Sequence, residues 1–303
     1  MNDSPAVPAS GPGAAPVPDP VPVPAVGAPR PKVSAYVIAF NEAAKIEAAV
    51  SSLLWADEIV VADSGSTDGT AGIATALGAR VVQIPFSGFG DLRNRAIAHC
   101  SGEWIFSLDA DERCTPEVRD EVLGIVAADG PADLWFVPRR NWFLGRWIRG
   151  SGWYPNYRQP QLFRNGRMAY TMDPVHEGFV SRSDRPPGHL RQAIWQIPFR
   201  DLEEVVRKAN RYSSLGAGKL AGRRVGPASA IAHATWAFVK HYVFKRGFLD
   251  GWPGFVIAFG NFEGTFWRYA KRWERDAAFA PPPLRRVERT APTARDSTEE
   301  LPR

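Results

Sequence analysis

Two carboxylates one residue apart, Asp109 and Asp111, follow an apolar run of strand length at residues 104–108 (WIFSL). Carboxylate oxygens in this spacing suit a hard divalent cation such as Mg²⁺ or Mn²⁺, which keeps open positions for water or phosphate oxygens. Such a cation can neutralise a diphosphate leaving group. Because a lone Asp-x-Asp is often a solvated turn, the segments beside it decide whether the pair predicts a metal site.

Two more polar clusters follow strand-like segments. Asn41-Glu42 comes after residues 33–40 (VSAYVIAF), and the loop of residues 63–68 (DSGSTD) comes after residues 58–62 (EIVVA). An acidic residue at a strand end can accept hydrogen bonds from a ribose hydroxyl or a base N–H, and small residues let a ligand approach the backbone. The plainer alternative is a turn in which Asp68 or a neighbouring threonine caps the next helix.

Strand and helix patterns alternate around these clusters. Residues 33–40, 58–62, 80–84 and 104–108 read as strands, with helical patterns after Asn41-Glu42, over residues 70–77 and around residues 90–100. This alternation predicts βαβ units and a mainly parallel sheet of the α/β class. Ligands bind at the carboxyl ends of the strands in such sheets, so three polar clusters at those ends predict one site. Residues 134–139 are expected to add another strand.

Several motifs are missing from the chain. It contains neither GxGxxG nor GxxxxGK[ST], which argues against a dinucleotide dehydrogenase and a P-loop NTPase. Its two cysteines, Cys100 and Cys114, lie in no CxxC pattern, so neither a zinc site nor a disulfide framework is expected.

Composition divides the chain into four parts. Residues 1–31 are mostly Ala, Pro, Val and Gly and predict a flexible tail, without the basic region of a signal peptide. Residues 32–200 are expected to form the α/β catalytic domain, residues 201–276 a helical C-terminal region, and residues 277–303 a second disordered tail.

The helical region is basic and aromatic. Residues 200–275 contain 14 Lys and Arg against 6 Asp and Glu. Such an excess favours anionic lipid or a phosphorylated substrate, and nucleic acid is the least favoured partner because no nucleic-acid-binding motif accompanies it. Charges interrupt every apolar run before the roughly 18 residues of a transmembrane helix, so no span is expected. The aromatic helices at residues 231–244 and 255–273 could lie on a membrane surface or pack on the core.

Four segments together resemble a known family. Residues 37–42 (VIAFNE), 61–70 (VADSGSTDGT), 89–97 (FGDLRNRAI) and 104–112 (WIFSLDADE) are similar, in this order, to the inverting glycosyltransferases of family 2, which have the GT-A fold. The resemblance implies a UDP-sugar donor and a divalent metal, Mg²⁺ or Mn²⁺. It implies that the donor is bound by Phe40, Asn41, Glu42, Asp63, Ser64, Asp68, Arg93, Asn94, Asp109, Ala110 and Asp111.

The resemblance also divides the roles. Glu42 and Asp63 would bind the nucleoside, and Arg93 and Asn94 would lie near the base or the diphosphate. Asp109 would contact the ribose or the donor sugar, and Asp111 would lead on the metal with Asp109 beside it. Glu112 is assigned nothing beyond orienting the turn.

Later segments resemble one branch of this family, the lipopolysaccharide inner-core β-glucosyltransferases. They are residues 152–155 (GWYP), 161–164 (QLFR), 175–177 (VHE) and 242–252 (YVFKRGFLDGW). Members often have arginine where this chain has Gln161, so an arginine that could touch phosphate or acceptor is missing here.

An inverting transferase needs a carboxylate base to take the proton of the acceptor hydroxyl. The resemblance implies that Glu177 is this base, with His176 orienting it or reaching the phosphate, and Asp173 is the reserve candidate. A His-Glu pair taken alone is far more often structural, and only its place in the matched segment favours catalysis.

These observations predict a metal-assisted hexosyltransferase, with glucose from UDP-glucose as the expected donor. The expected acceptor is a lipopolysaccharide-core or other lipid-linked sugar, and the expected location is the cytoplasm, peripheral on the inner face of the inner membrane. A polyprenyl phosphate or peptide acceptor is the first alternative. A catalytically silent protein that binds nucleotide-sugars is the second.

Overall fold

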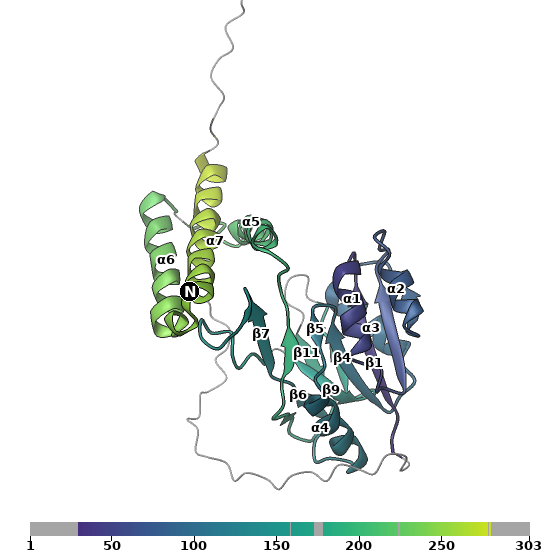
Figure 1. Cartoon of the computed structure of the whole chain (residues 1–303). Helices are drawn as coiled ribbons and strands as arrows, with labels where there is room; N and C mark the ends of the chain where they lie inside the picture. The colour runs from purple at the N-terminus through teal and green to yellow at the C-terminus, as the bar shows by residue number, and fades with distance from the viewer. Residues whose placement is uncertain (1–29, 158, 173–177, 224, 278, 280–303) are drawn as a thin grey trace, which may run out of the picture.

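The computed structural model describes residues 30–157, 159–172, 178–223, 225–277 and 279, and its centre is a seven-stranded sheet (Figure 1). The strand order is β12-β6-β9-β4-β1-β2-β3, and β9 alone runs against its neighbours. The predicted α/β fold with a mainly parallel sheet is confirmed. The strands are β1 (Val33–Ala39), β2 (Glu58–Asp63), β3 (Arg80–Gln83), β4 (Trp104–Asp109), β6 (Leu134–Phe136), β9 (Pro160–Arg164) and β12 (Gly188–His189).

Helices cover both faces of this sheet. One core cluster joins one face of β1 to α1 (Ala43–Ser51), α2 (Thr70–Ala76) and α4 (Pro116–Ala127). The other cluster joins the opposite face to α3 (Phe89–Ala98). Side chains alternate along β1, so that Val37 enters the first cluster and Tyr36 the second. Apolar residues on both faces are what a strand buried on both sides requires.

The register sets the carboxyl ends of three parallel strands side by side. Ala39 at the end of β1 is level with Asp63 at the end of β2, and Ile38 is level with Asp109 at the end of β4. Segments that leave these strands therefore emerge from one edge of the sheet. This edge is where ligands bind in open α/β sheets.

The single strand predicted over residues 134–139 is wrong, because the chain forms two strands there. β6 ends at Phe136, and β7 (Arg139–Phe143) belongs to a separate four-stranded sheet. Pro138 lies between them and has no N–H to continue a ladder. The order of this second sheet is β5-β13-β7-β8, and β10 and β11 form a separate two-stranded antiparallel sheet. The bounds are β5 (Glu112–Arg113), β8 (Arg146–Ile148), β10 (Met168–Tyr170), β11 (Phe179–Ser181) and β13 (Ile194–Gln196).

The C-terminal region is helical. It comprises α5 (Leu202–Gly218), α6 (Pro227–Val239), a π-helical turn (Lys240–Phe244), a 3₁₀ turn (Gly247–Asp250) and α7 (Gly251–Ala277). The long α7 packs against both α5 and α6 (Figure 1). In the described part of the chain, no helix is both long and apolar enough to cross a membrane.

A buried ion pair joins α5 to the sheet domain. The Lys45 ammonium on α1 lies 3.5 Å from the Glu204 carboxylate on α5, and both side chains are less than a tenth exposed. Glu204 also accepts a hydrogen bond from the Arg200 N–H and pairs with Lys208 at 2.9 Å. Burial would raise the pKa of Glu204, but these donors and cations outweigh it and lower the pKa to about 2.

We expect Glu204→Gln to lower the free energy of unfolding by about 2–3 kcal/mol near neutral pH. The folded-state pKa lies below the ordinary value of 4.5, so this stabilisation is present above that value and is lost as the pH falls toward about 2. Denaturant unfolding at about pH 7 and about pH 3 measures the difference, with Glu203→Gln on the exposed side of α5 as the control. An equal loss at both pH values would contradict the ionic origin.

Candidate active site

A fully buried carboxylate closes the turn after β4. Glu112 accepts hydrogen bonds from the Asp109 N–H at 2.9 Å and from the Gln161 side-chain amide at 2.9 Å. It also forms an ion pair with Arg139, whose side chain is 2% exposed. Through these three partners on β4, β7 and β9, Glu112 fixes the turn that carries Asp109 and Asp111.

Asp111 is the carboxylate of this turn that lacks a cation partner within ion-pair distance among the described residues. It accepts a 3.4 Å hydrogen bond from the Gln196 side chain, and its carbonyl accepts one from the Ile197 N–H at 2.8 Å. Burial, together with repulsion from Asp109 and Glu112, raises the pKa of Asp111 to about 7. A cation beside this carboxyl would relieve that repulsion and favour its charged form.

The donor set at this turn fits Mg²⁺ or Mn²⁺. Asp109 and Asp111 offer oxygen ligands, whereas no three His, Cys, Asp or Glu side chains of the described residues gather into a metal cage. Mg²⁺ is commonly held by one or two carboxylates, with waters and substrate phosphates filling the other positions. Asp111, which has no cation partner among the described residues, and Asp109 beside it suit that arrangement.

Arg93 on α3 lies next to Asp109. Its guanidinium donates a 2.7 Å hydrogen bond to Asp109 Oδ1 and a 3.4 Å bond to the Ser107 hydroxyl, and it stands over the Tyr170 ring at 5.4 Å. The Arg93 side chain is almost fully buried, whereas Asp109 is partly exposed. Arg93 therefore orients one oxygen of Asp109 and compensates its charge.

Asn94 has a mainly structural environment. Its amide nitrogen donates to the Tyr170 carbonyl at 2.9 Å, and its amide oxygen accepts from the Tyr170 N–H at 2.8 Å. This pair of bonds fastens β10 to α3. Both polar ends of Asn94 are thus used by backbone.

The loops after β1 and β2 are bonded to each other. The Asn41 N–H donates to the Ser66 hydroxyl at 2.8 Å, and the Asn41 side-chain oxygen accepts from the Thr67 N–H at 2.9 Å. Asn41 has a φ of 55°, a left-handed conformation that asparagine tolerates better than most residues. Asp68 accepts from the Ala43 N–H at 3.0 Å, so its carboxylate satisfies the first turn of α1.

Asp63 is fully buried and organises its own loop. Its carboxylate accepts hydrogen bonds from the Gly65 and Ser66 N–H groups and from the Ser66 hydroxyl. The Ser64 hydroxyl beside it is buried without a hydrogen-bond partner in the described structure. Phe40, at the end of β1, is 59% exposed. The Phe40 ring is therefore accessible at this edge, whereas the Ser64 hydroxyl is enclosed.

The structure brings the predicted residues after β1, β2 and β4 to one edge of the sheet. Asn41, Glu42 and Asp68 lie at its surface, Asp63 and Ala110 are buried, and Asp109 and Asp111 are partly exposed. The predicted catalytic pair His176 and Glu177, and the reserve Asp173, lie outside the described residues. The supporting residues Arg139 and Gln196 had no recognisable signal in the sequence, because their partners are far along the chain, and Gln161 was noted only as a departure from the family motif.

Comparison with known proteins agrees with these features. The family Glycosyl transferase family 2 matches residues 34–183. The lipopolysaccharide core biosynthesis glycosyltransferase LpsC of Rhizobium meliloti is 31% identical over 271 residues, which cover 84% of this chain and 96% of that protein. An uncharacterised glycosyltransferase of Rickettsia bellii is 30% identical, with 79% of this chain and 85% of that protein covered.

A solved structure is similar over a shorter part. It is glucosyl-3-phosphoglycerate synthase from Mycobacterium tuberculosis, in complex with Mn²⁺, uridine-diphosphate and glucosyl-3-phosphoglycerate. The sequence identity is 31% and the TM-score 0.32, and the match covers 37% of this chain and 44% of that chain.

The parallel sheet, the acidic turn at the end of β4 and these relatives define a nucleotide-sugar transferase of the GT-A class. The chain belongs to glycosyl transferase family 2, and it is a glycosyltransferase homologous to an enzyme of lipopolysaccharide core biosynthesis.

We expect Glu112→Gln to lower the free energy of unfolding by about 3–5 kcal/mol, because it leaves the buried Arg139 cation unpaired. The double variant Glu112→Gln/Arg139→Gln removes both charges and should recover part of this loss. Denaturant unfolding of these two variants and of the single variant Arg139→Gln measures the effect, with the exposed Glu117→Gln as the control. A double variant that is less stable by the sum of the two single losses would contradict the pairing.

Proposed function

We propose that this glycosyltransferase transfers a hexose, with glucose from UDP-glucose as the donor, to a lipopolysaccharide-core or other lipid-linked sugar. The observation that carries the proposal is the convergence of Asn41-Glu42, the residue 63–68 loop and the Asp109–Asp111 turn on one edge of a parallel sheet. The relationship to a lipopolysaccharide core enzyme over nearly its whole length supports the acceptor class.

In this proposal the donor lies across the two bonded loops. Glu42 binds the nucleoside directly, Asp63 contributes through the loop that its buried carboxylate shapes, and the exposed Phe40 ring favours a ligand at this point. Asn41 and Asp68 act chiefly by keeping the loops together. Arg93 keeps Asp109 oriented toward the ribose or the donor sugar.

Asp111 leads on the metal, with Asp109 as the second ligand and Ala110 as the turn between them. When bound, Mg²⁺ or Mn²⁺ supplies the charge that stabilises a diphosphate leaving group. The raised pKa of Asp111 is what a metal-ready carboxylate without a protein cation would have.

The base remains a proposal from the sequence. Glu177 takes the proton of the acceptor hydroxyl as that oxygen attacks the anomeric carbon from the side opposite the UDP, which inverts its configuration. His176 orients Glu177, and Asp173 is the reserve. If the assignment is correct, Glu177→Gln keeps UDP binding and loses turnover.

We expect Asp111→Asn to lower transfer by at least about a hundredfold and to remove its stimulation by Mn²⁺. Product mass spectrometry with a panel of nucleotide-sugars, run with and without metal on a truncated lipopolysaccharide acceptor, is the measurement. The exposed Asp120→Asn on α4 is the matched control and should keep full activity. Equal activity without metal would contradict the metal role, and UDP binding without turnover on any acceptor would favour a silent binding protein.

Polyprenyl phosphate and peptide acceptors enter the same assay as competing substrates. Transfer to either one in preference to the lipopolysaccharide core would replace the proposed acceptor while leaving the donor half of the proposal intact.

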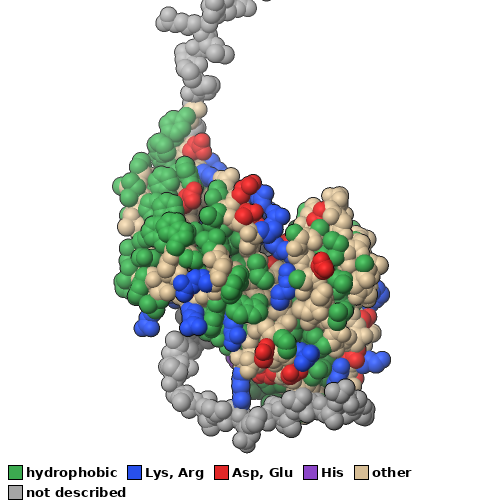
Figure 2. Space-filling model, viewed as in Figure 1, with side chains coloured by type: hydrophobic (Ala, Val, Ile, Leu, Met, Phe, Trp, Pro, Cys, Tyr) green, Lys and Arg blue, Asp and Glu red, His purple; other side chains and the backbone are tan. Residues whose placement is uncertain are grey.

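The helical region favours action at a membrane surface. Figure 2 shows hydrophobic side chains gathered over α6 and α7, with Lys and Arg along the lower edge. On α7, Ile257 and Ala258 are buried, whereas Trp252 is 68% exposed. Exposed aromatic groups flanked by cations suit an interface with anionic headgroups. The exposed apolar residues of α6, α7 and the turns between them include Ile231, Trp236, Val243, Phe244, Phe248, Leu249, Trp252, Phe259 and Trp267.

We expect Phe248→Ser/Trp252→Ser to weaken binding to anionic vesicles about tenfold or more, because each side chain loses the free energy of burial in the bilayer interface. Cosedimentation with phosphatidylglycerol vesicles measures it. Leu54→Ser, which alters an equally exposed residue beside α1, is the control. Unchanged binding of the double variant would contradict a membrane role for this face and a peripheral location on the inner membrane.

A further inference from the structure

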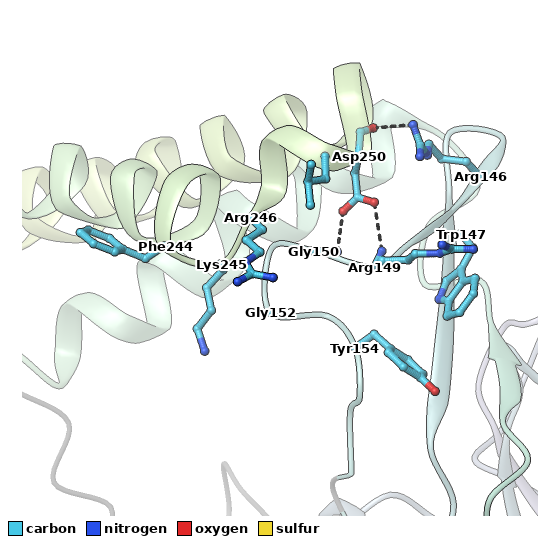
Figure 3. Close-up of a pocket in the computed structure, with 11 residues that line it drawn as sticks. Arg146, Trp147, Arg149, Gly150, Gly152, Tyr154, Phe244, Lys245, Arg246 and Asp250 are labelled. Carbon is cyan, nitrogen blue, oxygen red and sulfur yellow. Dashed lines mark hydrogen bonds between the residues drawn. The ribbon is translucent and has the colours of Figure 1, made fainter. Parts of the chain in front are cut away.

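A basic pocket lies apart from the acidic edge of the sheet. It has a volume of about 770 Å³ and opens between residues 146–154 and the turns at residues 244–250 (Figure 3). Arg146, Arg149, Lys245 and Arg246 supply four cationic side chains to its walls, and Trp147 and Tyr154 supply aromatic rings.

Hydrogen bonds to backbone groups hold the two sides of the pocket together. The buried Asp250 carboxylate accepts from the Arg149 N–H at 3.0 Å and the Gly150 N–H at 2.7 Å, and the Ser151 N–H donates to the Lys245 carbonyl at 2.7 Å. A Cβ on Gly150 would lie 2.4 Å from the Arg246 carbonyl oxygen, so only glycine allows this approach. The pocket is thus a built feature of the fold.

The protein balances the charge of the pocket only in part, because four cationic side chains and one carboxylate line it. Both oxygens of Asp250, the one acidic residue of the lining, are used by backbone N–H groups. Within the described structure, none of the four cationic side chains forms an ion pair. Arg146 donates to the Asp250 carbonyl at 3.0 Å, and Arg149 stands over the Trp147 ring at 4.4 Å. Guanidinium groups held this way are suited to a phosphate oxyanion.

The remaining lining indicates what carries the phosphate. Tyr154 offers an apolar ring with a polar tip, a combination that suits a face and a hydroxyl of a sugar. Trp147, in contrast, is stacked under Arg149 and Arg140 and holds the Arg149 guanidinium in place. Phe244 and Leu249 line the pocket and also belong to the exposed apolar face of the helical region. The pocket therefore opens next to the surface assigned above to the membrane.

We propose that this pocket binds a phosphorylated sugar of the membrane-bound acceptor. The inference deepens the proposed function and rests on it for the statement that the acceptor is a glycolipid. Cations bind the phosphate, the Tyr154 ring packs on the sugar, and the neighbouring apolar face keeps the lipid part in the bilayer.

Calorimetry with glucose 6-phosphate, glucose and inorganic phosphate tests the site. We expect glucose 6-phosphate to bind more tightly than the other two, and Arg149→Gln/Arg246→Gln to weaken it about tenfold or more. The matched control Arg119→Gln/Arg182→Gln removes two exposed arginines elsewhere and should leave binding unchanged. Arg149→Lys/Arg246→Lys keeps the charges and should retain more of the affinity than the glutamine variant, which separates charge loss from misfolding.

Three outcomes would overturn the proposal. If inorganic phosphate bound with the same affinity as glucose 6-phosphate, the sugar would make no contribution to binding. Loss of binding in Asp111→Asn, matching the loss in the pocket variant, would move the ligand to the donor site. Binding to phosphatidic acid vesicles that depends on the pocket arginines, without binding of glucose 6-phosphate, would make a bulk phospholipid the ligand.

The failure of this proposal can be told from the failure of the proposed function. Pocket-dependent binding of glucose 6-phosphate with no transfer to a lipopolysaccharide acceptor would contradict the proposed function alone. Transfer to that acceptor with unchanged rates in the pocket variant would contradict the pocket alone.

Discussion

The buried ion pair of Glu112 and Arg139 underlies the acidic edge of this enzyme. It joins the turn after β4 to the second sheet, and through Gln161 it also reaches β9. A buried ion pair is stabilising only when its oxygens and N–H groups all have hydrogen-bond partners. Glu112 meets this condition with three donors. The result is a rigid floor that leaves Asp109 and Asp111 to face outward with negative charge that the protein compensates only in part.

The rest of the site follows the same division between support and exposure. Asp63 and Asn94 turn their polar atoms inward to hold loop and hairpin, while Phe40, Glu42 and Asp111 remain accessible. Residues that belong to the same sequence motif therefore have different roles: some hold the structure together, and others stay accessible to a ligand. Two of the polar contacts that tie the helical region to this framework run through Glu204 to α1 and through Asp250 to the segment after β8. Those contacts hold the aromatic, basic surface of the helical region against the domain that carries the transferase site.

Much of the fold could be predicted from the sequence. β1, β2, β3 and β4 lie within one residue of their expected ends, because each is a short apolar run bounded by turn residues. The strand expected over residues 134–139 failed at Pro138, where one apolar run serves two sheets. Asp63 and Asp68 were candidates for either ligand binding or turn formation, and their hydrogen bonds show extensive use in the turns.

The sequence by itself determined the family, the parallel sheet and the positions of the acidic clusters, because hydrophobic periodicity and turn chemistry are local properties of the chain. Only the tertiary structure decided which polar groups form hydrogen bonds or ion pairs within the protein. Glu112 meets Arg139 across 27 residues, Asn94 meets Tyr170 across 76, and Asp250 meets Gly150 across 100. A pairing over such distances leaves no periodic signal, since it depends on how separate elements pack rather than on the residues beside each partner.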